Sequence, residues 1–483
     1  MKHENSNSGK VDLLCVPHQP EVNGLAPRRK LLILSLIFFT ALGVRLVNWH
    51  RSRNEVSAVQ TSVALNYKHQ ARLIQANGLA SLYDASSTTN NPDLLGHPLG
   101  YPILLSFIYR GAPESATATQ LLQMMLDSLA AVIICLIALK LFPATVGVIA
   151  GLLAAFAPQF SWNSILLLPD SLAALPILLA VLLIVRTRHQ HQHPTRAARV
   201  GTPHRPRRLL QILAAGVLIG VSCWLRANAL LLAPFLALLF PIIYKRGERL
   251  RTALVLVGGA CLVIAPLTIR NATVFGEFIP VSLGAGQTLI EGIADYNVDG
   301  SLGLPQTDME LIQGEAETFQ RPDYASSLFT PDGPARDRAR LARGFAVIRA
   351  HPFWFFGVMV RRAASMMRLE RTPLRLATTD SERWQNLFQW PLRFMQKLFI
   401  TAICLPLVLV GAGILIYQRQ FQSLAILLIV PCYYFSTQSA LHTEYRYVLV
   451  IHYFLFLLAA AAIYSIICQM TRMFRKTDSE SQS

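Results

Sequence analysis

Long apolar runs alternate with short charged connections over most of this 483-residue chain. A helix needs about 20 apolar residues to cross the hydrocarbon core of a bilayer. We therefore predict an all-α polytopic membrane protein with about 10 transmembrane helices, within a range of about 9 to 13. The candidate spans are residues 31–48, 118–141, 144–161, 164–185, 209–225, 227–244, 252–269, 394–417, 421–440 and 448–469.

Basic residues indicate which side of the membrane each connection faces. Clusters of Lys and Arg border the apolar runs at 28–30, 186–208, 245–251 and 472–476. Connections with such clusters stay in the cytoplasm. If the N-terminal tail is inside, alternate crossing places these clusters inside and the long segments 48–117 and 270–392 outside. We expect a multi-pass protein of the plasma (inner) membrane with both termini cytoplasmic, and chemistry on the outer face.

Composition agrees with a chain that is solvated mainly by the lipid bilayer. Hydrophobic residues make up 53% and charged residues 15%, whereas soluble domains carry about 25% charged residues. The net charge of +17 is explained by the clusters at span ends, so we expect no nucleic-acid partner. The 7 cysteines fall in apolar runs or the N-terminal tail, and no disulfide framework is predicted for the outer segments.

The same pattern divides the chain into five regions. They are a disordered cytoplasmic tail (1–30), a transmembrane catalytic core (31–269) with a first outer loop (48–117), a large extracytoplasmic loop region (270–392), the C-terminal transmembrane helices (393–470) and a cytoplasmic tail (471–483). Two apolar pieces within the outer segments, Tyr101–Tyr109 and Phe353–Val360, are too short to span. We expect interfacial or re-entrant helices there.

Several short motifs follow one another on the predicted outer face. They are Arg45-Leu-Val with an acidic residue about 10 positions later, Tyr67 with Ala71-Arg72-Leu73 and Gly78, His97-Pro-Leu-Gly-Tyr-Pro102, Leu168-Pro-Asp170, and Glu444-Tyr-Arg-Tyr447. In order and sidedness this set resembles the integral-membrane GT-C glycosyltransferases, particularly the protein-mannosyltransferase and aminoarabinose-transferase-like group. The resemblance covers roughly residues 30–470.

The resemblance implies a membrane glycosyltransferase that moves a sugar from a polyprenyl-phosphate donor to an unknown extracytoplasmic acceptor, with inversion. In that family a carboxylate of the first outer loop activates the acceptor hydroxyl. Glu55 is the candidate base, and Asp170, about two turns into the fourth predicted span, is the second catalytic carboxylate. Glu55 alternatively pairs with Arg51 or Arg53 at the interface, and Asp170 alternatively interacts with the dipole of its helix. Asp127, in mid-span, is expected to be structural.

Cationic groups on the outer face run against the positive-inside trend and suit the anionic headgroup of such a donor. The candidate donor-phosphate-binding residues are Lys68, His69, His97, Arg361, Arg362 and Arg446. The alternative is that these side chains reach towards ordinary phospholipid headgroups.

Cofactor signals are sparse. The family usually shows Asp where Glu55 stands here, which leaves the need for a divalent metal open. The run His189–His193 lies among Arg residues and is interpreted as a solvated cytoplasmic loop. Without a P-loop or a Gly-rich dinucleotide motif, no nucleotide cofactor is expected. A secondary transporter or lipid flippase, and an inactive GT-C-like assembly subunit, are the alternative functions.

Overall fold

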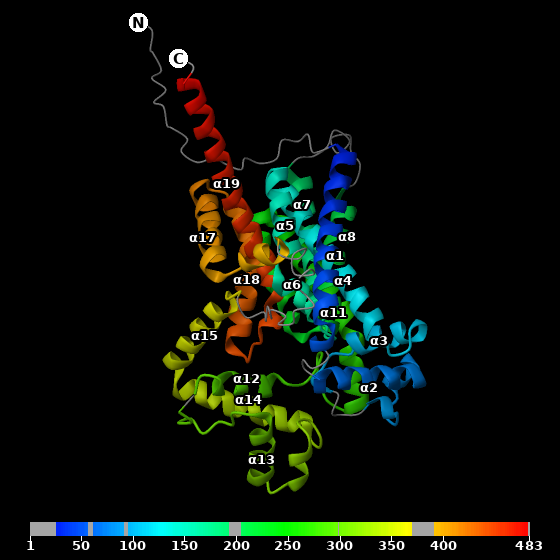
Figure 1. Ribbon diagram of the computed structural model, residues 1–483. Coiled ribbons are helices and arrows are strands. Elements are labelled where there is room, and N and C mark those ends of the chain that lie inside the picture. The colour runs from blue at the N-terminus through cyan, green and yellow to red at the C-terminus, as the bar shows by residue number, and fades with distance from the viewer. Residues whose placement is uncertain are drawn as a thin grey trace, which may run out of the picture.

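The computed structural model describes residues 26–56, 61–90, 95–192, 204–297, 299–369 and 391–481. Its described part contains helices and no strands (Figure 1). The helices of the first half are α1 (Pro27–Val56), α2 (Thr61–Asn77), α3 (Gly100–Gly111), α4 (Ala116–Leu141), α5 (Ala144–Phe156), α6 (Pro158–Asn163), α7 (Asp170–Gln192), α8 (His204–Leu225), α9 (Leu232–Ala237), α10 (Phe240–Ile243) and α11 (Arg246–Phe275). Those of the second half are α12 (Ala285–Ala294), α13 (Asp308–Thr318), α14 (Gly333–Ala350), α15 (Pro352–Met366), α17 (Thr401–Tyr417), α18 (Phe421–Thr437) and α19 (Leu449–Ser481).

The predicted spans are all represented. In the described part of the chain, 7 helices are long and apolar enough to cross a membrane, and a bent pair, Pro391–Lys397 with Thr401–Tyr417, adds one more. Two shorter apolar segments, Ala144–Phe156 and Ala227–Ile243, correspond to the remaining predictions. The fold class predicted from the sequence is therefore confirmed.

Two predicted spans differ in detail because proline interrupts them. Residues 227–244 form a 3₁₀ turn and the two short helices α9 and α10, with Pro234 and Pro241 in these helices. The fourth span begins at Asp170 rather than two turns earlier. Proline disfavours helical geometry at the residue before it, so Pro169 sets this start. Asp170 is therefore the first residue of α7 and does not lie two turns into the span.

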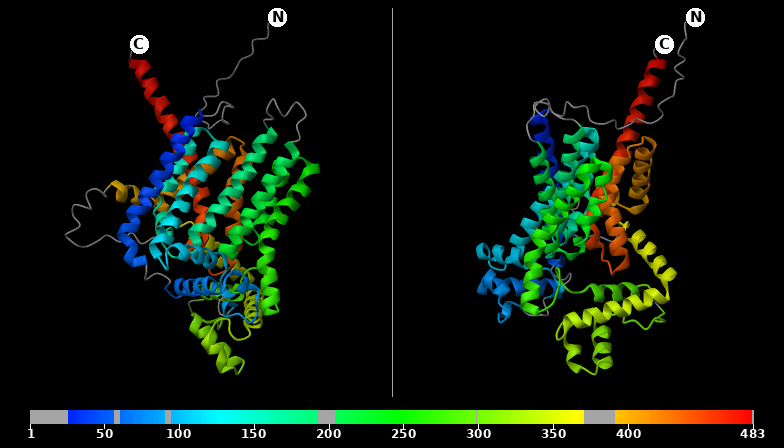
Figure 2. Two further views of the ribbon diagram at one scale, coloured as in Figure 1. Left: turned by 90° about the vertical axis from the view of Figure 1, so that its right-hand side faces the viewer. Right: turned by 180° about the vertical axis from the view of Figure 1, so that it is seen from behind.

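The outer segments gather at one end of the bundle. The start of α1 and the C-terminal part of α19 lie at the opposite end from α2, α12, α13 and α14 in Figure 1, and both views in Figure 2 agree. This arrangement is the one that the charge pattern predicts. The assignment of the first end to the cytoplasm remains a prediction from the basic residues.

Small residues allow the spanning helices to approach closely, as is usual in membranes. A Cβ atom on Gly216 of α8 would clash with the carbonyl of Leu256 in α11, and one on Gly259 would lie 2.5 Å from the carbonyl of Leu213. At the crossing of α8 and α11 the two backbones are therefore in direct contact.

A buried ion pair ties three spans together. Arg45 in α1 donates from Nε to Oδ2 of Asp127 in α4 over 2.7 Å, and Tyr453 of α19 donates to Oδ1 over 3.0 Å. Arg45 is 0% and Asp127 2% exposed. A charge in the hydrocarbon region is stable only when it is paired, so these contacts supply the partners that a structural Asp127 needs.

The helices α12 to α15 lie in the segment that is predicted to be outside, and we call them the outer domain. They share a small apolar core, which includes Leu289, Ile293, Leu311 and Phe355. Glu315 of α13 is held between two buried arginines of α14, Arg336 at 2.7 Å and Arg340 at 2.6 Å. These contacts fix α13 on α14, and Figure 1 shows α12 on the side of α14 that is nearer to the bundle.

The two short apolar pieces lie in α3 and α15. α3 has 12 residues and α15 has 15, so neither is long enough to span the bilayer. On α15 the side chains of Phe353, Phe356 and Val360 are exposed on one stripe, as expected for a helix at a membrane interface.

Candidate functional site

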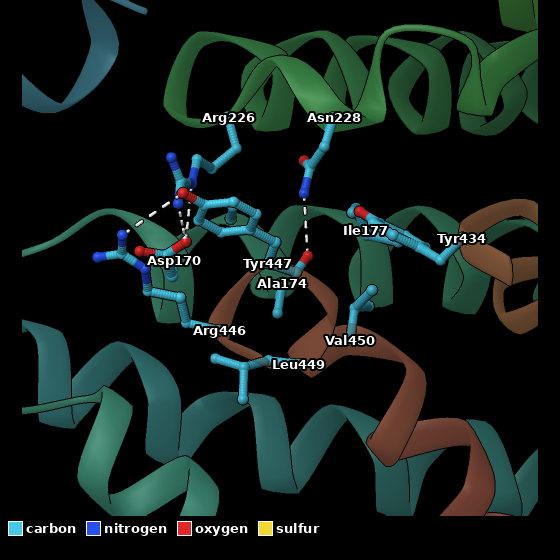
Figure 3. A pocket seen from close by; sticks show the side chains of 11 residues that line it. Asp170, Ala174, Ile177, Arg226, Asn228, Tyr434, Arg446, Tyr447, Leu449 and Val450 are labelled. Atoms are coloured by element: carbon cyan, nitrogen blue, oxygen red, sulfur yellow. Dashed lines mark hydrogen bonds and ion pairs between the residues drawn. The ribbon is translucent and has the colours of Figure 1, made fainter. Parts of the chain in front are cut away.

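A pocket lies between the start of α7, the end of α8 and the start of α19, at the end of the bundle that is predicted to be outside. Its lining residues are Asp170, Ala173, Ala174, Ile177, Arg226, Asn228, Tyr434, Arg446, Tyr447, Leu449 and Val450. Figure 3 shows the charged side chains Asp170, Arg226 and Arg446 together at one end, with Ile177, Val450 and Tyr434 at the other. The pocket is therefore polar at one end and apolar at the other.

The loop before α7 presents Asp170 to this pocket. Two glutamine side chains of α4 hold the loop, since Gln120 donates to the carbonyl of Ile165 over 2.8 Å and Gln123 to that of Leu166 over 2.7 Å. Asp170 then begins α7, where the helix N-terminus favours a carboxylate. At 5% exposure the carboxylate has little access to bulk water.

Arg226 is the first residue after α8, and its side chain reaches Asp170. Its backbone is extended, with φ −148° and ψ 124°. The guanidinium contacts Oδ1 of Asp170 twice, from Nε at 2.7 Å and from Nη2 at 2.5 Å. Oδ2 of Asp170 is buried and has no hydrogen-bond partner. One oxygen of this carboxylate is thus occupied, and the other is free to accept.

Arg446 brings a second guanidinium to the charged end. It is 8% exposed and donates from Nη2 to Glu444 over 2.7 Å. Its Nε and Nη1 groups are buried without a hydrogen-bond partner. Leaving a buried donor unsatisfied costs about 1–3 kcal/mol, more for a charged group. Such donors suit an anion that arrives from outside the protein.

Tyr447 separates the two guanidinium groups. Its ring centroid is 4.1 Å from Arg226 and 5.2 Å from Arg446, so each cation interacts with the aromatic ring. Asn228 donates to the backbone carbonyl of Tyr447 over 2.9 Å, and the Tyr447 hydroxyl donates to Glu444 over 3.2 Å. These bonds hold Tyr447 in place, so that the guanidinium groups of Arg226 and Arg446 both lie near the carboxylate of Asp170.

His97 and Tyr67 of the first outer segment lie beside the charged end. Their rings are 5.1 Å apart. Burial, together with the positive charges of Arg226 and Arg446, lowers the pKa of His97 to about 4, so the imidazole is neutral at physiological pH. The Tyr67 hydroxyl is buried without a hydrogen-bond partner, and burial raises its pKa. Both groups can offer neutral hydrogen bonds here.

The structure thus brings together three of the site residues predicted from the sequence, namely Asp170, His97 and Arg446. Lys68 and His69 are on α2 next to Tyr67, half-buried and exposed respectively, and do not line the pocket. Glu55 is in the last turn of α1, and its side chain lies outside the described residues.

Two further predicted cations belong to the outer domain. Arg361 is exposed on α15, with its guanidinium 5.2 Å from the ring of Tyr296. Arg362 is buried and donates to the backbone carbonyls of Gly292 and Ser439. Arg362 therefore connects α15 to α12 and to the segment after α18.

Sequence reasoning missed Arg226 and Asn228, and it named Tyr447 as part of the motif Glu444–Tyr447 without giving it a role. Arg226 carried a usable signal, because it is a lone cation at the predicted outer end of a span, against the positive-inside trend. In the described part of the chain, no three His, Cys, Asp or Glu side chains are grouped so that they could hold a metal ion.

No protein-family model and no curated protein sequence matches the chain. Among solved structures, the oligosaccharyltransferase of Archaeoglobus fulgidus in the apo form matches with a TM-score of 0.51 and 15% identity, over 93% of this chain and 52% of that chain. The oligosaccharyltransferase AglB from Archaeoglobus fulgidus, in complex with an inhibitory peptide and a dolichol-phosphate, matches with a TM-score of 0.51 and 16% identity, over 94% of this chain and 52% of that chain.

The chain has the GT-C fold. The fold that the sequence motifs predicted is therefore confirmed. The chain spans about half the length of these oligosaccharyltransferases. ArnT from Cupriavidus metallidurans, bound to undecaprenyl phosphate, is a more distant match, with a TM-score of 0.35 and 14% identity over 91% of this chain and 78% of that chain.

Proposed function

We propose that this protein is a membrane glycosyltransferase that transfers a sugar from a polyprenyl-phosphate donor to an acceptor on the extracytoplasmic face, with inversion at the anomeric carbon. One observation carries the proposal. Arg446 has two buried donor nitrogens without a partner, Nε and Nη1, at the charged end of a pocket whose opposite end is apolar. A polyprenyl phosphate has the same division, with an anionic head and an apolar chain. In the AglB structure a dolichol-phosphate is bound on the same fold.

The charged end suits the leaving group. In the transfer, the acceptor oxygen bonds to the anomeric carbon while the bond from that carbon to the phosphate oxygen breaks. Charge then builds on the departing phosphate, and fixed cations in a site poor in water stabilise it. Arg446 and Arg226 are the proposed cations, and neutral His97 is the proposed additional hydrogen-bond donor.

The acceptor hydroxyl must lose a proton as it attacks. Oδ2 of Asp170 is the buried oxygen with no partner, so we propose that it accepts a hydrogen bond from the acceptor. Glu55, at the end of α1, remains the proposed general base. Positioned acid–base groups contribute rate factors of about 10²–10⁴. The apolar wall of Ile177, Leu449 and Val450 would carry the first isoprene units.

The test uses purified full-length protein in lipid nanodiscs with decaprenyl-phosphate hexose, and measures released decaprenyl phosphate by mass spectrometry. Asp170→Asn is expected to lower the release rate about 100-fold or more. Asp84→Asn changes an exposed carboxylate of the same outer face and is expected to stay within about twofold of the wild type, as a solvent-exposed substitution should. Equal rates for the wild type and Asp170→Asn would contradict the proposal for this site.

A further inference from the structure

The loop that precedes Arg446 contacts the outer domain. It runs from Gln438 to Glu444, between α18 and the 3₁₀ turn Tyr445–Val448. The backbone N–H of His442 donates to the carbonyl of Thr288 in α12 over 2.6 Å. A Cβ atom on Gly292 of α12 would lie 2.5 Å from the same nitrogen. Loop and helix thus meet backbone to backbone.

Charged side chains reinforce this contact. Nδ1 of His442 is 2.9 Å from Oδ2 of Asp295, the residue that follows α12. Arg362 of α15 is 3.6 Å from the same oxygen and donates to the carbonyl of Ser439 over 2.8 Å. Asp295 is therefore shared by a cation from the outer domain and a histidine from the loop.

The loop transmits this contact to the pocket over four residues. Thr443 donates to the carbonyl of Gln438 over 2.6 Å and closes the loop on itself. Glu444 then accepts from Arg446 over 2.7 Å. A displacement at His442 would accordingly move Glu444, and with it the guanidinium that lines the pocket.

We propose that His442 is a positioning residue, whose protonated ring clamps the loop to Asp295 and thereby holds Arg446 at the charged end of the pocket. This inference rests on the proposed function, because it concerns the binding of the same donor. It adds a control that the pocket residues alone do not provide, since the clamp connects donor binding to the outer domain and to pH.

The charges around His442 determine the sign of the pH effect. Asp295 and Glu291 face it from α12, Arg362 faces it from α15 beyond Asp295, and Glu444 faces it from its own loop. The hydrogen bond with Asp295 raises the pKa of His442, and the charges of Asp295, Glu291 and Glu444 add to this effect. A group whose pKa is raised on folding stabilises the contact at low pH and loses this effect as pH rises through the raised value.

Glu291 modifies this response. Burial, followed by the hydrogen bond with Asp308 of α13, raises the pKa of Glu291 to about 8. Glu291 is therefore largely neutral at neutral pH and becomes an anion near pH 8. That new negative charge favours the protonated form of His442, so the clamp opens at a higher pH than it would with Asp295 alone.

The test compares wild type, His442→Gln and a matched control, His351→Gln, in the full-length protein. His351 is an exposed histidine of the outer domain outside the clamp. Hydrogen exchange of residues 438–447 is measured from pH 6 to 9 and corrected for the intrinsic pH dependence of exchange. We expect protection to fall about tenfold across this range in the wild type and the control, and to be low and independent of pH in His442→Gln.

The second readout is transfer from decaprenyl-phosphate hexose. At pH 6, His442→Gln should raise KM for the donor about tenfold with a smaller change in kcat, and the difference from wild type should vanish by pH 9. Asp295→Asn removes the other half of the clamp and should behave alike, which covers a failure of the first variant to fold. Identical protection and identical pH profiles in wild type and His442→Gln would overturn the inference. Protection that depends on pH as expected, with no transfer by any form, would support the clamp and contradict the proposed function.

Discussion

Arg446→Gln tests whether donor binding depends on the arginine in the pocket rather than on the other cations of the outer face. The wild-type guanidinium offers two buried donor nitrogens, Nε and Nη1, with no partner in the protein. Glutamine retains a polar side chain but has neither the charge nor the fork of donors. We expect this variant to bind polyprenyl phosphate much more weakly, while the fold stays intact.

The size of the effect follows from the two donors. A hydrogen bond to a charged group is worth about 1.5–3 kcal/mol, so the loss of two amounts to at least about 3 kcal/mol. Since about 1.4 kcal/mol corresponds to a factor of 10, Kd should rise roughly 100-fold. Arg446→Lys keeps the charge but not the planar fork, and should fall between the two.

Stability should change in the opposite sense or not at all. In the protein without ligand, the unpartnered donors of Arg446 are a cost, and their removal should not lower Tm. A weak-binding variant with an unchanged or higher Tm would show that the loss is local to the pocket. This pattern is the usual conflict between stability and function at binding sites.

The assay is binding of decaprenyl phosphate to the purified protein in nanodiscs, followed by microscale thermophoresis. Arg361→Gln is the control, because Arg361 is also an outer-face arginine predicted from the sequence but is exposed on α15 and does not line the pocket. Its Kd should stay within about twofold of the wild type, as for other exposed substitutions. An equal loss for both variants would refute the reasoning, since it would show that binding responds to the general positive charge of the outer face.

Three further substitutions test the fold that supports the site. Asp127→Leu leaves Arg45 as an unpaired buried charge and should cost about 3–5 kcal/mol, which Arg45→Met in the same chain should largely restore in thermal unfolding. Gly216→Leu forces α8 away from α11 and should lower stability by about 1–3 kcal/mol, whereas Gly247→Leu, with open space around its Cα, should not. Glu291 has a pKa raised to about 8, so the outer domain should lose stability as pH rises from about 5 to 8; Glu291→Gln should flatten this dependence in hydrogen exchange.

The fold was predictable because the signals that determine it are local. The length of an apolar run fixes a span, and adjacent Lys and Arg residues indicate its sidedness. Proline was the source of error, because Pro169, Pro234 and Pro241 move helix boundaries inside runs that are uniformly apolar by composition. These shifts matter for the site, since one of them places Asp170 at a helix start.

The candidate site was predictable only in part, because it is assembled from distant segments. Asp170 and Arg226 are 56 positions apart, and their contact depends on the packing of α7 against α8. Position next to the membrane also does not show which way a guanidinium turns. Arg446 faces the pocket. Arg362 looked equivalent in the sequence, but it donates to one carbonyl of α12 and one of the loop after α18.

The most direct test of the central claim is a cryo-EM structure of the protein in nanodiscs with decaprenyl phosphate. We expect the phosphate within about 3 Å of Nη1 or Nε of Arg446, as for a charge-assisted hydrogen bond, with the prenyl chain along Ile177, Leu449 and Val450. A phosphate bound at Lys68 or Arg361, with the pocket between α7, α8 and α19 unchanged, would contradict the account.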